Sequence, residues 1–251
     1  EFGLLGYWPL DGNSSDMSGN GRDGTRHNGA AFQAGVVGQG LYFDGSNDYF
    51  SVPTFPMGGE FSISLWAKYD RFRDWDCVMD FANGSTSQNL KINMGNSGST
   101  VRGMIFQMKT SNGDRYSGGQ YWILNNWVHL VLTVDKDATI KGYRSGSLID
   151  TQTGSTFADS ITRNNHWFGK STWNDNHFKG KLDEIRLYDR AILAEEALQL
   201  ALQGNTTPYD LNSTAPLNLS EGQAIGSDVG QFTAVEPDAW DSVSYELFDN
   251  N

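Results

Sequence analysis

The sequence has a single cysteine, Cys77, among its 251 residues, so no disulfide can form within the chain. It has no run of about 20 apolar residues, the length that a membrane-spanning helix needs. Basic residues are scarce, because 18 Lys and Arg stand against 30 Asp and Glu, for a formal net charge of −12. Nucleic-acid binding requires a basic surface to meet the phosphates, so this balance argues against it.

A secretory leader is also missing, since neither a charged n-region nor an apolar h-region follows Glu1. We therefore expect a mature or excised piece of a larger protein. Without disulfides, an extracellular domain needs another stabilising link, and a bound metal is the usual substitute. The surplus of carboxylates would attract divalent cations, although it serves solubility equally well.

Alternation of apolar and polar side chains with a period of two runs through much of the chain. It is clear at residues 61–66, 127–134 and 184–188, and it is typical of strands half-buried in a sheet. Both faces of 127–134 are largely apolar, which predicts a central strand. The best helical pattern is LAEEALQLALQ at 193–203, before Gly204. The sequence predicts an all-β, two-sheet antiparallel jelly-roll sandwich with one short C-terminal helix.

The composition changes after the predicted helix. Residues 205–220 are rich in Asn, Thr, Ser and Pro, which indicates a linker. Two strand-like pieces follow within 221–251, far fewer residues than the roughly 100 of a complete immunoglobulin-like sandwich. We therefore expect a sandwich domain over 1–204 and the truncated start of a second module over 221–251.

Four segments resemble the laminin-G-like jelly-roll family of concanavalin A-type lectins. GYWPLDGNSSDMSGNGRDG at 6–24 is similar to the opening strand and double turn, and LYFDGSNDYFSVP at 41–53 to the second strand pair. FKGKLDEIRLYDRAIL at 178–193 resembles the closing strand and the start of the terminal helix, and NWVH at 126–129 the mid-domain tryptophan strand. The resemblance covers about residues 3–203, and it implies a structural calcium held by carboxylate and backbone oxygens.

Asp183 is the first metal candidate, because the alternation places it on the same face as Ile185 and Leu187. A carboxylate buried beside apolar side chains is costly unless a cation or several donors compensate, and Ca²⁺ prefers oxygen ligands. In a jelly roll the closing strand lies beside the opening strand, which would bring further oxygens close. The predicted calcium ligands are Asp11, Asp44, Gly45 and Asp183. The alternative is that Asp183 caps the strand end or pairs with Lys or Arg.

Catalytic motifs are missing. Glycanases on this fold carry alternating acids on one strand, in the manner E-x-D-x-x-E, and no such run occurs. The acidic loop at 11–24 departs from an EF-hand, with Asp16 at position six and Arg22 at position twelve, and predicts Asx-type turns instead. We expect no enzymatic activity.

Two polar loops each carry a tryptophan that we expect to be exposed, Trp75 in RDWDC and Trp173 in STWNDNHF. Sugars are bound by aromatic faces beside amides and carboxylates, so both loops are candidates for glycan binding. Asn89, Lys91 and Gln107 alternate with apolar residues and could line a sheet face. The predicted ligand-binding residues are Asp74, Trp75, Asp76, Asn89, Gln107, Trp173, Asp175 and His177. The alternative is that the two indoles fold back as plugs on the edge of the sandwich.

The C-terminal segment resembles the start of a bacterial cadherin-like repeat, through Leu219-Ser220-Glu221 and AVEPDAWD at 234–241. Glu236 stands where that family usually carries Asp. The resemblance implies a second calcium site at Glu221, Glu236 and Asp238.

Three functions remain open. The first is a non-catalytic, calcium-stabilised recognition module, for a glycan or cell-surface polysaccharide, in a large secreted or cell-surface adhesion protein. The second is a structural spacer or a protein–protein interaction module that contacts other modules of an adhesin. The third is a divergent glycoside hydrolase.

Overall fold

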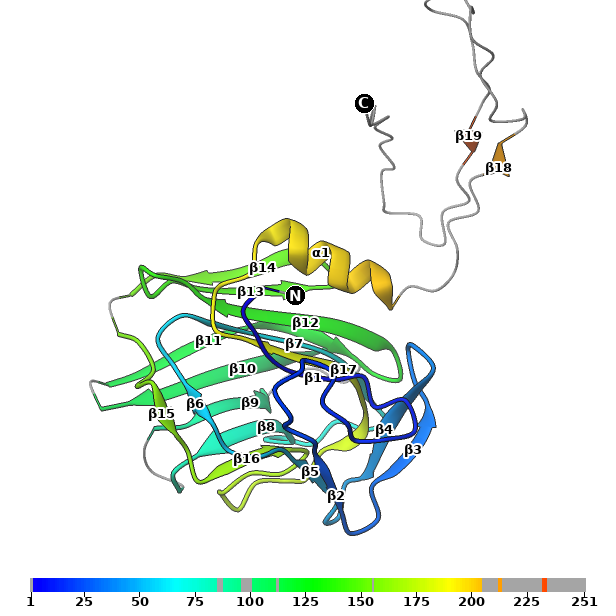
Figure 1. Ribbon diagram of the computed structural model, residues 1–251, viewed down its shortest axis with the longest axis horizontal. Helices are drawn as coiled ribbons and strands as arrows, with labels where there is room; N and C mark the ends of the chain where they lie inside the picture. The colour runs from blue at the N-terminus through cyan, green and yellow to red at the C-terminus, as the bar shows by residue number, and fades with distance from the viewer. Residues whose placement is uncertain are drawn as a thin grey trace, which may run out of the picture. The chain divides into compact units, whose positions relative to one another are not determined.

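The computed structural model describes residues 2–84, 88–95, 101–111, 113–154, 156–204, 212–213 and 232–233. The chain divides into two units, Glu1–Gly204 and Asn205–Asn251. The first unit is a sandwich of two antiparallel sheets (Figure 1), which confirms the predicted fold class. No helix within the described part of the chain is long and apolar enough to cross a membrane.

The two sheets are long and share one core. The first contains, in spatial order, β14 (Ser147–Gln152), β13 (Ile140–Arg144), β12 (Trp127–Val134), β7 (Phe61–Tyr69), β17 (Lys179–Tyr188), β4 (Gln39–Asp44) and β3 (Ala31–Ala34), with β1 (Leu4–Trp8) also paired to β17. The second contains β11 (Gly113–Ile123), β10 (Val101–Thr110), β9 (Leu90–Met94), β8 (Cys77–Ala82), β16 (Asn165–Phe168), β5 (Tyr49–Ser51) and β2 (Thr25–His27). A short pair joins β6 (Pro56–Met57) to β15 (Ile161–Thr162).

Large aromatic side chains fill the space between the sheets. Trp8 from the first sheet meets Phe50 from the second with ring centroids 6.5 Å apart in a T-shaped arrangement. Phe43 and Phe178 meet in the same manner at 5.7 Å. Because each such ring buries about 150–250 Å², a modest apolar fraction suffices to build the core.

The segments predicted as strands form strands. Residues 61–66 lie in β7, 127–134 coincide with β12, and 184–188 lie in β17. The prediction that 127–134 is central is confirmed, because β12 lies between β13 and β7 and a helix covers its outer face. That helix is α1 (Ala194–Gln203), which runs beside β12 to β14 in Figure 1.

The loop at 11–24 forms the predicted Asx-type turns. Asn13 Oδ1 accepts a hydrogen bond from the Ser15 N–H at 2.9 Å, and Asp16 Oδ1 accepts one from Ser18 N–H at 2.9 Å. Asp16 also accepts from the Tyr7 N–H, which fixes the loop to β1. These backbone bonds lower the pKa of Asp16 even though burial opposes them.

A β-bulge in the closing strand changes the face that Asp183 occupies. Between Asp183 and Arg186 the pairing of β17 with β7 slips, and Glu184 takes a left-handed φ of 51°. Asp183 is opposite Trp66, which lies outside the core cluster, whereas Ile185 belongs to the core. The prediction that these two side chains share a face is therefore wrong, because the extra residue at the bulge reverses the alternation after Asp183.

The second unit is described only at two short strands. β18 (Asn212–Ser213) pairs antiparallel with β19 (Phe232–Thr233). The predicted linker and cadherin-like residues otherwise lie outside the described residues, as do Glu221, Glu236 and Asp238.

Candidate functional site

The outer face of the second sheet carries a row of polar side chains across four adjacent strands. Asp80 on β8 pairs with Lys91 on β9, Lys91 with Gln107 on β10, and Gln107 with Tyr116 on β11. Asp80, Lys91 and Gln107 each lie between core residues along their strands, so they point away from the core, and Tyr116 is paired with Gln107. The register thus brings together residues that are up to 36 positions apart in sequence.

A ten-residue loop between β16 and β17 lies against this row. Its ends meet where the Phe178 N–H donates to the Gly169 carbonyl at 3.1 Å. Inside the loop, Ser171 Oγ accepts from the Trp173 N–H at 2.8 Å. The loop is therefore closed by its own hydrogen bonds, as expected of a compact surface loop that positions one side chain.

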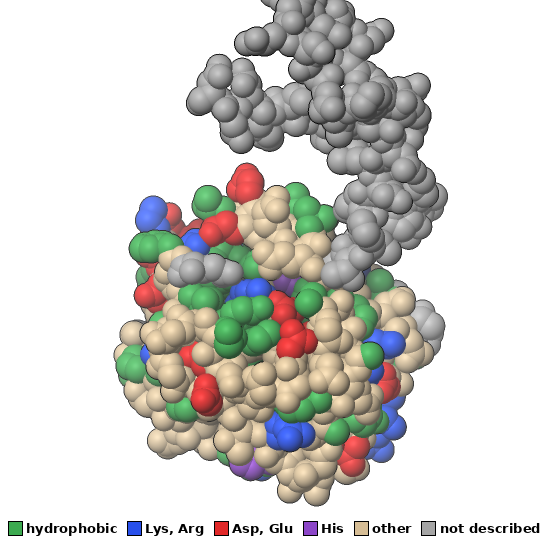
Figure 2. All heavy atoms as spheres, turned by 45° about the vertical axis from the view of Figure 1, so that its right-hand side comes forward, with side chains coloured by type: hydrophobic (Ala, Val, Ile, Leu, Met, Phe, Trp, Pro, Cys, Tyr) green, Lys and Arg blue, Asp and Glu red, His purple; other side chains and the backbone are tan. Residues whose placement is uncertain are grey.

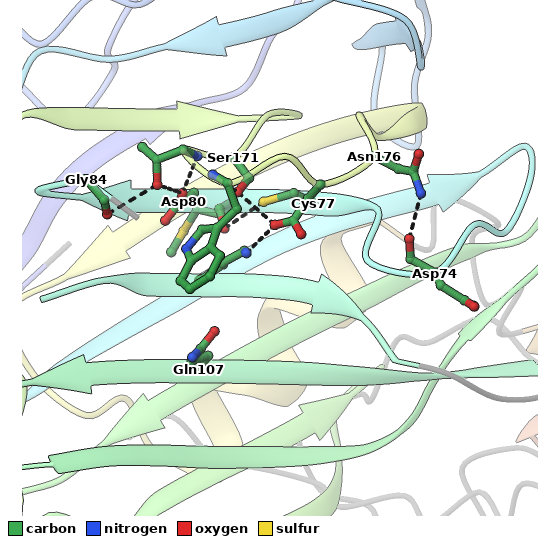
Figure 3. Close-up of polar contacts among 12 residues, drawn as sticks. Asp74, Cys77, Asp80, Gly84, Gln107, Ser171 and Asn176 are labelled. Atoms are coloured by element: carbon green, nitrogen blue, oxygen red, sulfur yellow. Dashed lines mark hydrogen bonds and ion pairs between the residues drawn. The ribbon is translucent and has the colours of Figure 1, made fainter. Parts of the chain in front are cut away.

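Two contacts fix the loop to the sheet. Asp80 Oδ2 accepts from the N–H and the hydroxyl of Thr172 at 2.7 and 2.8 Å. Asp175 forms an ion pair with Lys91 and accepts from the Ser171 hydroxyl at 2.8 Å. Figure 3 shows Asp80 and Ser171 close together, with Gln107 two strands away.

Trp173 is held above this face with 38% of its surface exposed. The ammonium groups of Lys91 and Lys109 lie 5.2 and 5.3 Å from the centre of its ring, which is within the range of a cation–π contact. Gln107 Nε2 lies 3.2 Å from the Tyr116 hydroxyl. We call this surface the Trp173 shelf; its residues are Lys91, Gln107, Lys109, Asp114, Tyr116, Trp173 and Asp175.

Asp80 supports the shelf from below and has no exposed surface. Burial raises the pKa of its carboxyl group, and the two hydrogen bonds from Thr172 partly offset this. Cys77, on the same strand, is also fully buried, and burial raises the pKa of its thiol well above the usual value. A buried, protonated thiol is a structural residue, not a nucleophile.

The structure brings Gln107, Trp173 and Asp175 together on the shelf. Asn89 lies beside Leu90 at the start of β9 and is fully buried. Its amide has no hydrogen-bond partner within the described part of the chain. Asn89 is thus covered and does not line the exposed surface.

The other predicted loop lies next to the shelf and is joined to it. Asn176 Nδ2 donates to the Asp74 carbonyl at 2.8 Å, a contact that Figure 3 shows set apart from those around Asp80. Trp75 is 43% exposed and has a φ of 65°, a left-handed conformation that is uncommon for a bulky residue. Asp76 is fully buried and accepts from the Arg73 N–H at 3.0 Å. Asp76 therefore closes the turn and does not face a ligand.

His177 lies at the base of the ten-residue loop, in a bridge to Cys77. Burial lowers its pKa, and so does the charge of Lys170. Among the described residues, no hydrogen bond, ion pair or ring contact joins it to the shelf, so the structure does not bring His177 together with Trp173.

Sequence reasoning missed several shelf residues. Lys109 alternates with the core residues Phe106 and Met108 on β10. The period of two therefore predicts that its side chain lies on the outer face of the sheet. Asp114 and Tyr116 could not be placed in this way, because β11 mixes exposed and half-buried residues without a clear apolar face. Their place depends on the hairpin register with β10, which no local pattern states.

The predicted calcium ligands are only partly brought together. Asp183 accepts hydrogen bonds from the N–H groups of Val36 at 2.8 Å and Val37 at 3.1 Å. Asp11 accepts from the N–H of Gln39 at 2.6 Å, in the same loop. Burial raises the pKa of Asp183 to about 7, with a further contribution from the charge of Glu184.

Asp44 and Gly45 do not belong to that cluster. Leu182 of β17 pairs with Leu41 of β4, and Lys179 pairs with Asp44. Asp44 therefore lies three residues, about 10 Å, beyond Leu41 along β4 and away from Asp183. The Gly45 carbonyl accepts a hydrogen bond from Arg71 Nη2 at 2.9 Å. The prediction that Asp44–Gly45 joins Asp183 is therefore wrong, because the turn ends the strand at the other end of the pairing.

A metal could still fit beside Asp183. Its buried carboxylate forms no ion pair with Lys, Arg or His within the described residues, which leaves its charge for a cation to balance. Against this, the described residues contain no group of three or more His, Cys, Asp or Glu that could hold a metal ion. A calcium here would take Asp183, Asp11 and backbone carbonyl oxygens, a mixture that Ca²⁺ accepts.

A cavity of about 330 Å³ lies elsewhere, lined by Leu5, Met57, Glu60, Phe61, Ser160 and Asp189 among others. Its aromatic ring, that of Phe61, is fully buried. It offers no exposed ring for a sugar to stack on, so the Trp173 shelf is the better candidate for glycan binding. On the face shown in Figure 2, acidic and basic side chains are interspersed among uncharged atoms.

Comparisons with known proteins agree with the fold. A family model described as the concanavalin A-like lectin/glucanases superfamily matches residues 44–198, which include the whole shelf. Domain 4 of AbnA, an extracellular GH43 arabinanase from Geobacillus stearothermophilus solved with arabinotriose, aligns at a TM-score of 0.65 and 23% identity. That alignment covers 79% of this chain and 98% of the other. A search of curated protein sequences gave no match.

Two toxin binding domains are also similar. The botulinum neurotoxin serotype G binding domain aligns at a TM-score of 0.68 and 13% identity, over 81% of this chain and 51% of the other. The binding domain of Paraclostridial Mosquitocidal Protein 1 aligns at 0.57 and 19%, over 79% and 52%. This chain thus spans about half the length of these toxin domains, and at such identities the likeness concerns the fold alone.

Proposed function

The chain belongs to the concanavalin A-like lectin/glucanases superfamily, and from that premise we propose that it is a non-catalytic module that binds a glycan at the Trp173 shelf. The observation that carries the proposal is the exposed indole of Trp173, held above a row of amide, hydroxyl and charged groups. An indole face packs against the C–H surface of a sugar, while the polar row can bond its hydroxyls.

The ordered loop supports this assignment. An exposed tryptophan on a loop is a functional signal when the loop is fixed in place, because its conformational entropy has already been lost. Here the Asp175–Lys91 ion pair and the Thr172–Asp80 bonds fix the loop. The solved relative that binds arabinotriose supports a sugar ligand, since it has the same fold over nearly its full length.

The carboxylates near the shelf favour binding over hydrolysis. A glycosidase needs two carboxyl groups that reach the scissile bond from either side. Asp80 has no exposed surface, and Asp175 is paired with Lys91 and bonded to Ser171. These two acids therefore do not support a divergent hydrolase. Release of reducing sugars by the purified protein would support that alternative.

We expect Trp173→Ala to weaken glycan binding about tenfold, because an aromatic contact contributes roughly 1–1.5 kcal/mol beyond area burial. A glycan array identifies the ligand, and titration calorimetry with that ligand, or with arabinotriose, measures the loss. Trp75→Ala is the matched control, since Trp75 is equally exposed but lies on the neighbouring loop. Equal binding by wild type and a folded Trp173→Ala variant would refute the proposal.

We also propose that the chain belongs to an extracellular or cell-surface adhesion protein. An extracellular or cell-surface adhesion protein fits a sugar-binding sandwich followed by a second module, and it is supported by the extracellular relative. A spacer or protein-contact role within an adhesin is the alternative. If it holds, a protein carrying both Trp75→Ala and Trp173→Ala adheres as well as the wild type.

We include a stabilising calcium at Asp183 and Asp11 in the proposal. The support is the raised pKa of the buried Asp183 carboxyl and the shared loop that both carboxylates contact. A cation bound there would offset the cost of burying that charge. The second calcium, implied at Glu221, Glu236 and Asp238, rests on the cadherin-like resemblance alone.

Chelation should lower the melting temperature of the wild type by about 5 °C or more, because a ligand bound only to the native state stabilises it by mass action. Differential scanning calorimetry with and without excess chelator measures the shift. Asp183→Asn should melt at one temperature in both conditions, while Asp44→Asn should respond like the wild type. Identical wild-type curves after long equilibration with chelator would rule the site out.

A further inference from the structure

We infer that the Trp173 shelf selects uncharged sugar units and rejects acidic ones, and that Asp114 enforces this selection. The inference rests on the proposed glycan-binding function and specifies its substrate class. It follows from how the charges of the shelf are already paired with one another. The two lysines beside Trp173 are the cations that an acidic sugar would need, and each has a carboxylate partner.

Lys91 is neutralised inside the site. Only 3% of its side chain is exposed, against 16% for its partner Asp175. Because Asp175 also accepts from Ser171, the pair is fixed by the same loop that carries Trp173. A ligand carboxylate would have to displace the half-buried Asp175 to reach this ammonium group, and that exchange is unfavourable.

Lys109 is neutralised at the open side of the shelf. Its Nζ lies 3.2 Å from Asp114 Oδ2, and 17% and 36% of the two side chains are exposed. The Tyr116 hydroxyl donates to the same carboxylate at 3.3 Å. Lys109 is thus the ammonium group that a ligand could reach, and Asp114 is the group that competes for it.

The carboxylates exceed the ammonium groups at this surface. Asp80, Asp114 and Asp175 lie around Lys91 and Lys109 among the described side chains. Lys170 lies apart, with its ammonium group 4.6 and 4.5 Å from the rings of Tyr49 and Trp167 on β5 and β16, beyond β8. A uronic or sialic acid would therefore meet repulsion, whereas a neutral sugar needs only the indole and the hydrogen-bonding groups.

The inference is tested with a panel of neutral and acidic oligosaccharides, arabinotriose and trigalacturonate among them, at low ionic strength. The wild type should bind neutral members and bind acidic ones at least about fivefold more weakly. Asp114→Asn frees Lys109 and should strengthen binding of acidic members about fivefold relative to binding of neutral members. Added salt should remove that gain.

Asp137→Asn is the matched control, because it removes one carboxylate from the exposed Lys136–Asp137 pair, whose atoms are 2.7 Å apart on another loop. It should leave both classes of ligand unchanged. If the wild type prefers acidic sugars and Trp173→Ala abolishes their binding, this inference is overturned while the proposed function stands. An equal gain in the two Asn variants would also overturn it, and a panel with no ligand at all would refute the proposed function and this inference with it.

Discussion

Replacing Arg163 with Met should lower the free energy of unfolding by about 3–5 kcal/mol, the cost typical of removing one side of a buried charged contact. Arg163 has no exposed surface. Its guanidinium donates to the backbone carbonyls of Gln88, Met57, Asp159 and Ile161. Gln88 and Met57 are 75 and 106 residues from Arg163 in sequence, and without the guanidinium the buried Met57 carbonyl would lose this donor.

Burial lowers the pKa of Arg163 to about 10, so the side chain still carries its charge at neutral pH. Arg163→Lys should recover part of the loss, since it keeps the charge but offers one donor group in place of the planar fork. Arg144→Met is the control: Arg144 makes one exposed bond to the Gln120 carbonyl, and its loss should cost less than about 0.5 kcal/mol. Urea titration followed by tryptophan fluorescence gives all three values, and a loss below 1 kcal/mol for Arg163→Met would contradict the argument.

The fold could be predicted from the sequence because its signal is local. Alternation in 61–66 and 127–134 states which side chains enter the core, and the 193–203 pattern states where the helix runs. Each of these patterns needs only a few neighbouring residues. The sandwich then follows, because strands of this kind must bury one face against a second sheet.

The position of Asp183 could not be predicted, because it depends on a bulge. Glu184 has no sequence feature that announces a left-handed φ of 51°, since Gly, Asn and Asp are the residues that usually adopt it. One inserted residue reverses every side chain after it. Asp44 and Gly45 were wrong for a different reason, their distance along the strand from Asp183, and only Asp11 and Asp183 contact one loop.

The site was predicted in part for a similar reason. Trp173 was found because a tryptophan amid Asn, Asp and His is an unusual composition. Asp175 and Gln107 were also named as candidates, but the contacts that hold the loop on the sheet were not predicted, because Lys91 and Asp175 are 84 residues apart and Thr172 meets Asp80 across 92. Contacts of that range depend on how the strands pair with one another, which is a property of the whole sheet.

Two histidines that are buried in their neutral form should each make this protein less stable in acid. His166 stacks on Phe81 at 4.0 Å and meets the edge of Phe55 at 4.7 Å. Neither of its ring nitrogens has a hydrogen-bond partner within the described residues. Burial lowers its pKa to about 3, helped by the charges of Arg163 and Arg22.

His129 behaves in the same way. It is almost fully buried, and its Nε2 shares a hydrogen bond of 2.9 Å with Ser64 Oγ. Burial lowers its pKa to about 3, with a smaller effect from the charge of Arg186. In the unfolded chain both histidines regain a pKa near 6.5.

Because the folded pKa of each histidine is below the unfolded value, the unfolded chain binds more protons between these values. The free energy of unfolding is therefore at its full value, with respect to these histidines, above pH 6.5, and it decreases as the pH falls towards 3. Each histidine should lower the free energy of unfolding by about 1.4 kcal/mol per pH unit in that window, or roughly 3 kcal/mol by pH 4.5. Asp80 and Asp183 act in the opposite direction, since burial raises the pKa of both, so the contribution of the histidines is measured best as a difference between variants.

The variants are His166→Phe, which keeps the aromatic contacts, and His129→Gln, which keeps a partner for Ser64. Urea titrations at pH 7.5, 6.0 and 4.5, each referred to the same variant at pH 7.5, remove any constant change in stability. Each single variant should lose about 3 kcal/mol less than the wild type by pH 4.5, and the double variant about twice that. A difference that stays constant across the three pH values would show that these histidines are protonated as easily in the folded protein as in the unfolded chain.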